Sequence, residues 1–133
     1  MTDTAPRHQQ RERALSLLYE AELKGEDPVA VADALAVPPD PYVRTLLEHA
    51  VTTRAEAERR IAGASVGWPL DRMAVIDRLV LRLAVAELLD PAGPPPAVVI
   101  DEAVELVKAY STDESGRFVN GILSTIVADI GPR

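Results

Sequence analysis

The sequence predicts an all-α protein, a single-domain bundle of about six to seven helices, and three observations support this fold class. Apolar residues recur at spacings of three and four along most of the chain, which is the period of a helix with one buried face. No segment alternates apolar and polar residues over four or more positions, so half-buried strands are not predicted. A length of 133 residues allows one domain with a substantial core.

Residues 74–89 are the most apolar stretch, and we predict that they form the central helix. Neither Gly nor Pro interrupts them, and their only charged residues are Asp77, Arg78, Arg82 and Glu87. Charges near the middle of a bilayer cost about 2.5 to 3.5 kcal/mol each, which excludes a membrane span. Asp71, Arg78 and Arg82 project within about 40° of one another and should form a narrow solvated stripe. Asp77 projects about 100° from Arg78, away from that stripe.

Proline and glycine divide the chain before this stretch into three predicted helices. The start signals are Asp27-Pro28 and Asp40-Pro41, and the stop signals are Gly25, Pro38-Pro39 and Gly63. The third helix, over residues 41–63, is predicted to be unbroken because its apolar residues keep one face for about five turns. His49 lies within it, and we interpret this histidine as a packed or surface residue.

Proline-rich residues 90–96 separate the central helix from a helix that runs to Tyr110. The acids near the start of that helix are interpreted as surface residues with no facing base or metal ligand, and not as catalytic carboxylates; they are Asp101, Glu102 and Glu105. Ser111 and Glu114 fit a capping box for the last helix.

Phe118, the only phenylalanine, is rotated by about 100° from the centre of the apolar face of the last helix. Two interpretations stay open. As a core residue it would be at least partly buried, as most phenylalanines are. As an aromatic platform at the rim it would stack an unpaired RNA base.

The composition excludes several classes of function. A net charge of −7 argues against a broad nucleic-acid-binding surface, so any such contact must be local. The absence of cysteine excludes thiolate metal sites and thiol catalysis and fits a reducing compartment, and His8 and His49 are too far apart for a familiar zinc spacing. No catalytic motif or phosphate-binding glycine loop occurs. We therefore predict no catalytic, cofactor or metal site, and we expect a cytoplasmic protein because no apolar leader is present.

Residues 1–12 are predicted to be a basic N-terminal arm that leads into the first helix. Arg7 and Arg11 lie on the helix line that Ala14 and Leu18 continue, so they extend the buried face beyond the core. Two interpretations are open for this arm. It is either a solvated, frayed first turn or a phosphate-binding element.

Three blocks of the sequence resemble the NusB family of bacterial transcription antitermination factors. They are RERALSLLYEAEL (11–23), LDRMAVIDRLVLRLAVAEL (70–88) and VVIDEAVELVKAYSTDESGRFVNGIL (98–123), and the last is the most specific. The resemblance implies a helical bundle of two packed subdomains over residues 1–133, without catalysis. It further implies binding of single-stranded boxA-type leader RNA together with NusE, a ribosomal small-subunit protein, in the RNA polymerase antitermination complex. The family includes both monomers and homodimers.

Residue by residue, the resemblance implies two sets of binding side chains. The RNA-binding set is Arg7, His8, Arg11, Glu114, Ser115 and Phe118, and the partner-binding set is Tyr19, Leu23, Asp77 and Arg78. The arm departs from the family pattern, because His8, Gln9 and Gln10 stand where some members carry a near-continuous run of arginine. A basic partner is therefore expected to supply much of the attraction for phosphate.

Two classes of function follow from these residues. The first is a non-enzymatic RNA-binding assembly factor, and the alternative is a helical protein-interaction module that does not bind RNA and whose arm is a solvated end. Salt distinguishes the two, because single-stranded RNA binding should weaken with a log–log slope of about −0.7 per neutralised phosphate.

Overall fold

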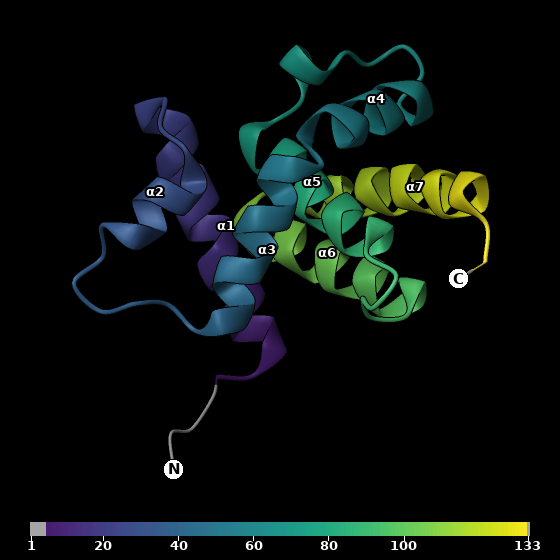
Figure 1. Cartoon of the computed structure of the whole chain (residues 1–133). Coiled ribbons are helices and arrows are strands. Elements are labelled where there is room, and N and C mark those ends of the chain that lie inside the picture. The colour runs from purple at the N-terminus through teal and green to yellow at the C-terminus, as the bar shows by residue number, and fades with distance from the viewer. Residues whose placement is uncertain (1–4, 133) are drawn as a thin grey trace.

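The computed structural model describes residues 5–132, which fold into seven α-helices and one 3-10 turn without a strand (Figure 1). The helices are α1 (Arg7–Lys24), α2 (Pro28–Asp33), α3 (Pro41–Thr52), α4 (Arg54–Ala64), α5 (Val75–Leu89), α6 (Pro96–Tyr110) and α7 (Asp113–Ile130), with η1 (Leu70–Arg72) before α5. The predicted all-α class is thereby confirmed. The first four residues of the predicted arm 1–12 lie outside the described part of the chain.

Proline and glycine set the ends of several helices as the sequence predicts. Pro28, Pro41 and Pro96 each occupy the first turn of a helix, where the missing amide hydrogen leaves no bond unmade. The Asp27 side chain accepts a hydrogen bond from Val29 N and so caps α2. Gly25 ends α1 with a φ of 65°, a conformation that glycine adopts without a steric penalty.

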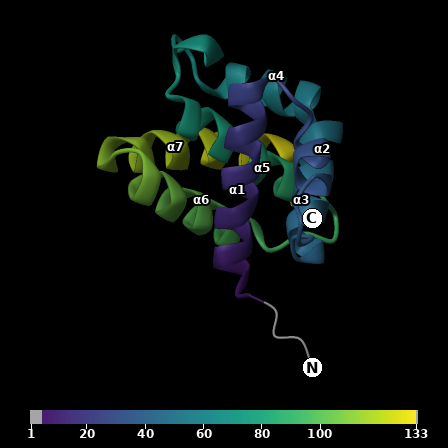
Figure 2. The same ribbon diagram turned by 90° about the vertical axis from the view of Figure 1, so that its left-hand side faces the viewer.

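The helices form two packed groups, α1–α3 and α4–α7, which meet at α5 (Figure 1). Every residue of α5 from Leu79 to Leu88 is buried, which agrees with its prediction as the central helix. Figure 2 shows α1 crossing in front of α5, with α2 and α3 on one side and α6 and α7 on the other. Within residues 5–132 no helix combines the length and the apolar character needed to cross a bilayer.

The prediction of one unbroken helix over residues 41–63 is wrong, because Thr53 separates α3 from α4. Thr53 has φ −99° and ψ 4°, and its hydroxyl donates to the carbonyl oxygen of His49 at 2.6 Å. A β-branched residue whose hydroxyl competes for the backbone carbonyl favours such a bend. The apolar face continues across the break through buried Ala57 and Ile61.

The predicted solvated stripe on the central helix is also wrong. Asp71 is exposed, but Arg82 is only 2% exposed and Arg78 is partly covered. Burial, with a further contribution from nearby Arg54, lowers the pKa of Arg82. Asp71 lies on η1 and not on α5, so its predicted angle to Arg78 does not apply, and α1 and α4 pack over the side of α5 that carries Arg78 and Arg82.

The N-cap of the last helix lies one residue later than predicted. Thr112, and not Ser111, is the N-cap, and its Oγ1 accepts from Ser115 N at 3.0 Å. Ser111 instead ends α6. Ser115 therefore occupies the third helical position that the prediction gave to Glu114.

Candidate nucleic-acid and partner interface

Arg7, at the start of α1, is exposed but held in place. Its guanidinium carbon lies 3.7 Å from the centroid of the Tyr42 ring on α3, within the range of a cation–π contact. Its Nη1 also donates to Gln10 Oε1 at 2.6 Å, and Gln10 is 1% exposed. The first turn of α1 is therefore anchored, which contradicts the interpretation of a frayed end.

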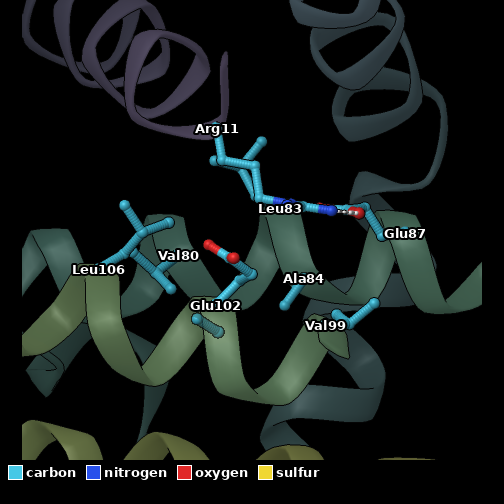
Figure 3. Close-up of a pocket in the computed structure, with 9 residues that line it drawn as sticks. Arg11, Val80, Leu83, Ala84, Glu87, Val99, Glu102 and Leu106 are labelled. Carbon is cyan, nitrogen blue, oxygen red and sulfur yellow. Dashed lines mark hydrogen bonds and ion pairs between the residues drawn. The ribbon is translucent and has the colours of Figure 1, made fainter. Parts of the chain in front are cut away.

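Arg11 lies one turn further on and is buried, at 5% exposure. Its Nε and Nη2 donate to the two carboxylate oxygens of Glu87 on α5, at 2.8 and 3.0 Å (Figure 3). The Tyr42 hydroxyl donates to the same carboxylate at 2.9 Å. The cavity that remains beside this pair measures about 10 Å³, barely room for one water molecule.

This geometry changes the interpretation of the predicted RNA contact by Arg11. The Arg11 guanidinium is buried and bonded to the Glu87 carboxylate, so it is not exposed to a phosphate group. Arg11 therefore anchors α1 to α5 in this structure. Helical spacing gave no sign that Tyr42 and Glu87 meet Arg11, because they lie 31 and 76 positions away from it in the sequence.

His8 lies among three carboxylates on α1 and α6. Its Nδ1 is 2.8 Å from Glu102 Oε2 and 3.7 Å from Glu105 Oε2, while its Nε2 is 3.8 Å from Glu12 Oε1. The prediction that no base faces Glu102 and Glu105 is therefore wrong. The ligand atoms of His8, Glu102 and Glu105 lie within 4.8 Å of one another, and within residues 5–132 only these three form a cluster of the kind that holds a metal ion.

The carboxylates around His8 should make stability depend on pH. The hydrogen bond to Glu102 raises the pKa of His8 above its ordinary value of 6.5. The stabilisation is therefore fully present below the unfolded-state pKa and is lost as pH rises through the folded-state pKa. We expect the free energy of unfolding, measured by urea titration between about pH 6 and pH 9, to fall more in wild type than in His8→Gln. An unchanged pH dependence in His8→Gln would contradict this assignment.

The N-terminal turn of α7 meets that of α5. Asp77 is 6% exposed, and its Oδ2 accepts from Ser115 Oγ at 2.8 Å. Its Oδ1 is buried without a hydrogen-bond partner. Asp77 is a partner-binding candidate and Ser115 is an RNA-binding candidate, and the two are in direct contact. Both side chains therefore also stabilise this turn.

Phe118 is half-buried and packs against the core, and it also lines a surface groove. The groove has a volume of about 690 Å³ and lies between the α4–α5 connection and the start of α7. Exposed Val66 and Trp68 form its other wall, and Glu114 stands at the start of α7. Phe118 is therefore partly buried, as the core interpretation requires, and the RNA-platform interpretation stays a prediction. Trp68 was not singled out as a site residue, although an exposed tryptophan between glycine and proline is a recognisable signal.

The remaining partner-binding candidates lie along α1 and α5. Tyr19 is 37% exposed and Leu23 is 68% exposed. On the same face of α1, Glu22 accepts from Arg78 Nη1 at 2.8 Å, which lowers the pKa of Glu22. Asp77 and Arg78 are neighbours in α5, yet Asp77 bonds to α7 and Arg78 bonds to α1. The RNA-binding candidates therefore lie in two places: Arg11 contacts Glu87 near the C-terminal end of α5, and Ser115 contacts Asp77 in its first turn, next to the partner-binding candidate Arg78.

Comparison with known proteins agrees with this fold and these motifs. The transcription antitermination protein NusB of Saccharopolyspora erythraea is 47% identical over 133 residues, covering 96% of this chain and 89% of the relative. The crystal structure of T. maritima NusB is 33% identical, with a TM-score of 0.87 over 98% of this chain and 96% of that one. A chain from the complex of antitermination factors NusB and NusE with dsRNA is 31% identical, with a TM-score of 0.79 over 92% and 96%.

These features define a helical bundle with candidate binding residues for RNA and protein around α5. Residues 8–128 match the NusB family, and the chain belongs to that family.

Proposed function

We propose that this chain is a transcription antitermination factor that binds boxA-type leader RNA of rRNA operons together with NusE and joins the elongating RNA polymerase complex. The observation that carries this proposal is the likeness to a chain of the NusB–NusE–dsRNA complex over nearly the whole of both chains. The function is binding without catalysis, in the cytoplasm, with residues 1–133 as one RNA-binding helical domain.

On the RNA side, Arg7 contacts a phosphate group and Phe118 stacks a base. Arg7 suits this role because it is exposed and pre-oriented on Tyr42. Phe118 suits it because its groove offers two aromatic walls for an unpaired base. Glu114 can only accept hydrogen bonds when ionised, so it faces base amino groups and not phosphates. Arg11 and Ser115 act by holding these elements in position.

On the protein side, NusE covers the exposed face formed by Tyr19, Leu23 and the Glu22–Arg78 pair, with Asp77 at its border. The net charge of −7 means that this chain alone attracts RNA weakly. NusE, as a basic partner, supplies additional positive charge next to the RNA. Binding of RNA and NusE is therefore expected to be mutually reinforcing.

The test is a titration of boxA-type leader RNA at two salt concentrations, with and without NusE. We expect affinity to increase when NusE is present and to weaken with salt, at a slope of about −0.7 per neutralised phosphate. Arg7→Ala should weaken matched and scrambled RNA almost equally and make the slope shallower, because phosphate contacts carry no sequence information. A failure to bind RNA at low salt, with NusE as well as without, would instead favour the protein-interaction module.

A further inference from the structure

The Arg7 guanidinium is held at two places at once. Its flat face lies 3.7 Å from the centroid of the Tyr42 ring, and its Nη1 donates to Gln10 Oε1 at 2.6 Å. Gln10 is itself fixed, because its Nε2 donates to Ala5 O at 2.8 Å and to Asp40 Oδ2 at 3.3 Å. An arginine with five N–H donors that uses one of them on Gln10 keeps others for a ligand.

The Tyr42 ring is in turn held by the buried ion pair beneath it. Its hydroxyl donates to Glu87 Oε2 at 2.9 Å, and Glu87 is fixed by two hydrogen bonds from Arg11. Burial and the Glu87 carboxylate raise the pKa of Tyr42 to about 12, so the hydroxyl remains a donor at any physiological pH. The orientation of the exposed Arg7 side chain therefore depends on a buried network, in which Arg11 and Glu87 are each 5% exposed.

We propose that Tyr42 is a positioning residue for RNA binding, which presents the Arg7 guanidinium to a phosphate group of the leader RNA. This inference rests on the proposed function. A long, flexible arginine loses conformational freedom when it binds a phosphate, and stacking removes that loss in advance. The ring does so without touching RNA, and the hydroxyl has the separate role of fixing the ring to Glu87.

Four variants test this by titration of boxA-type leader RNA in the presence of NusE. Arg7→Ala measures the phosphate contact itself. Tyr42→Leu removes the ring, Tyr42→Phe keeps the ring and removes the hydroxyl, and the double variant Arg7→Ala with Tyr42→Leu completes a double-mutant cycle. Circular dichroism confirms that each variant is folded, and Tyr42→Phe is the mildest should Tyr42→Leu fail to fold.

We expect Tyr42→Leu to weaken RNA binding by about two- to fivefold, the size of an exposed cation–π contact, and Tyr42→Phe, which keeps the ring but loses the hydrogen bond to Glu87, to weaken it less. In the Arg7→Ala background, Tyr42→Leu should cause no further loss. Additive losses, an unchanged affinity in Tyr42→Leu, or a loss in Tyr42→Phe that is larger than the loss in Tyr42→Leu would each overturn the positioning role. The Arg7 contact itself is tested separately. If Arg7 does not contact RNA, Arg7→Ala will bind RNA like wild type, and the positioning role of Tyr42 is then overturned as well.

Discussion

Replacing Glu87 with alanine is expected to lower the free energy of unfolding by about 3 to 5 kcal/mol, because the variant leaves the Arg11 guanidinium buried without its counter-charge. Both partners are 5% exposed and share two hydrogen bonds, and the Tyr42 hydroxyl would lose its acceptor as well. Urea unfolding of the wild type and the variant under the same conditions measures this difference.

Two control variants distinguish the free-energy cost of leaving a charge buried from the cost of losing an ion pair. Glu48→Ala removes an exposed carboxylate that accepts from Arg44 at 2.8 Å, and it should cost no more than about 1 kcal/mol. The double variant Arg11→Met with Glu87→Leu removes both charges and should recover most of the stability lost in Glu87→Ala. If Glu87→Ala is no more destabilising than Glu48→Ala, Arg11 is not anchored as the structure indicates.

Replacing Phe118 with alanine is expected to weaken binding of boxA-type RNA by about 1 to 3 kcal/mol, the value of one lost base–aromatic stack. Because the side chain is only half-buried, the free energy of unfolding should fall by less than the roughly 3 to 5 kcal/mol of a fully buried phenylalanine. Thermal melting and RNA titration of the same variant measure the two effects separately.

The neighbouring residue supplies a matched control for Phe118. Val119 is fully buried, so Val119→Ala should destabilise the fold while the folded fraction binds RNA normally. A variant Phe118→Ala that melts at a much lower temperature yet keeps its RNA affinity would return Phe118 to the core.

The sequence was sufficient to predict the helices because their ends and faces are local properties. Proline and glycine mark the ends of α1, α2 and α6, and the apolar content of residues 74–89 indicates the central position of α5. The bend at Thr53 was missed because the apolar face continues through it. A face that is continuous in sequence does not require a continuous helix.

The polar contacts of the site were beyond prediction because they join distant residues. Arg11 meets Glu87 and Tyr42 meets Glu87 only after α1 and α3 have packed against α5. Helical rotation places Arg82 on the charged side of α5, but only packing by α1 and α4 decides that this side is buried. The roles of Arg7, Phe118 and the NusE-facing residues stay predictions.

The polar contacts of the first helix join residues that are synthesised at different times. Arg11 is 76 residues from Glu87, and His8 is 94 residues from Glu102, so these bonds form only after α5 and α6 have emerged. Synthesis proceeds from the N-terminus at about 5 to 20 residues per second, so α1 waits several seconds for these partners. A nascent chain that ends before α5 therefore carries α1 without its anchor on Glu87, and one that ends before α6 lacks the contact between His8 and Glu102.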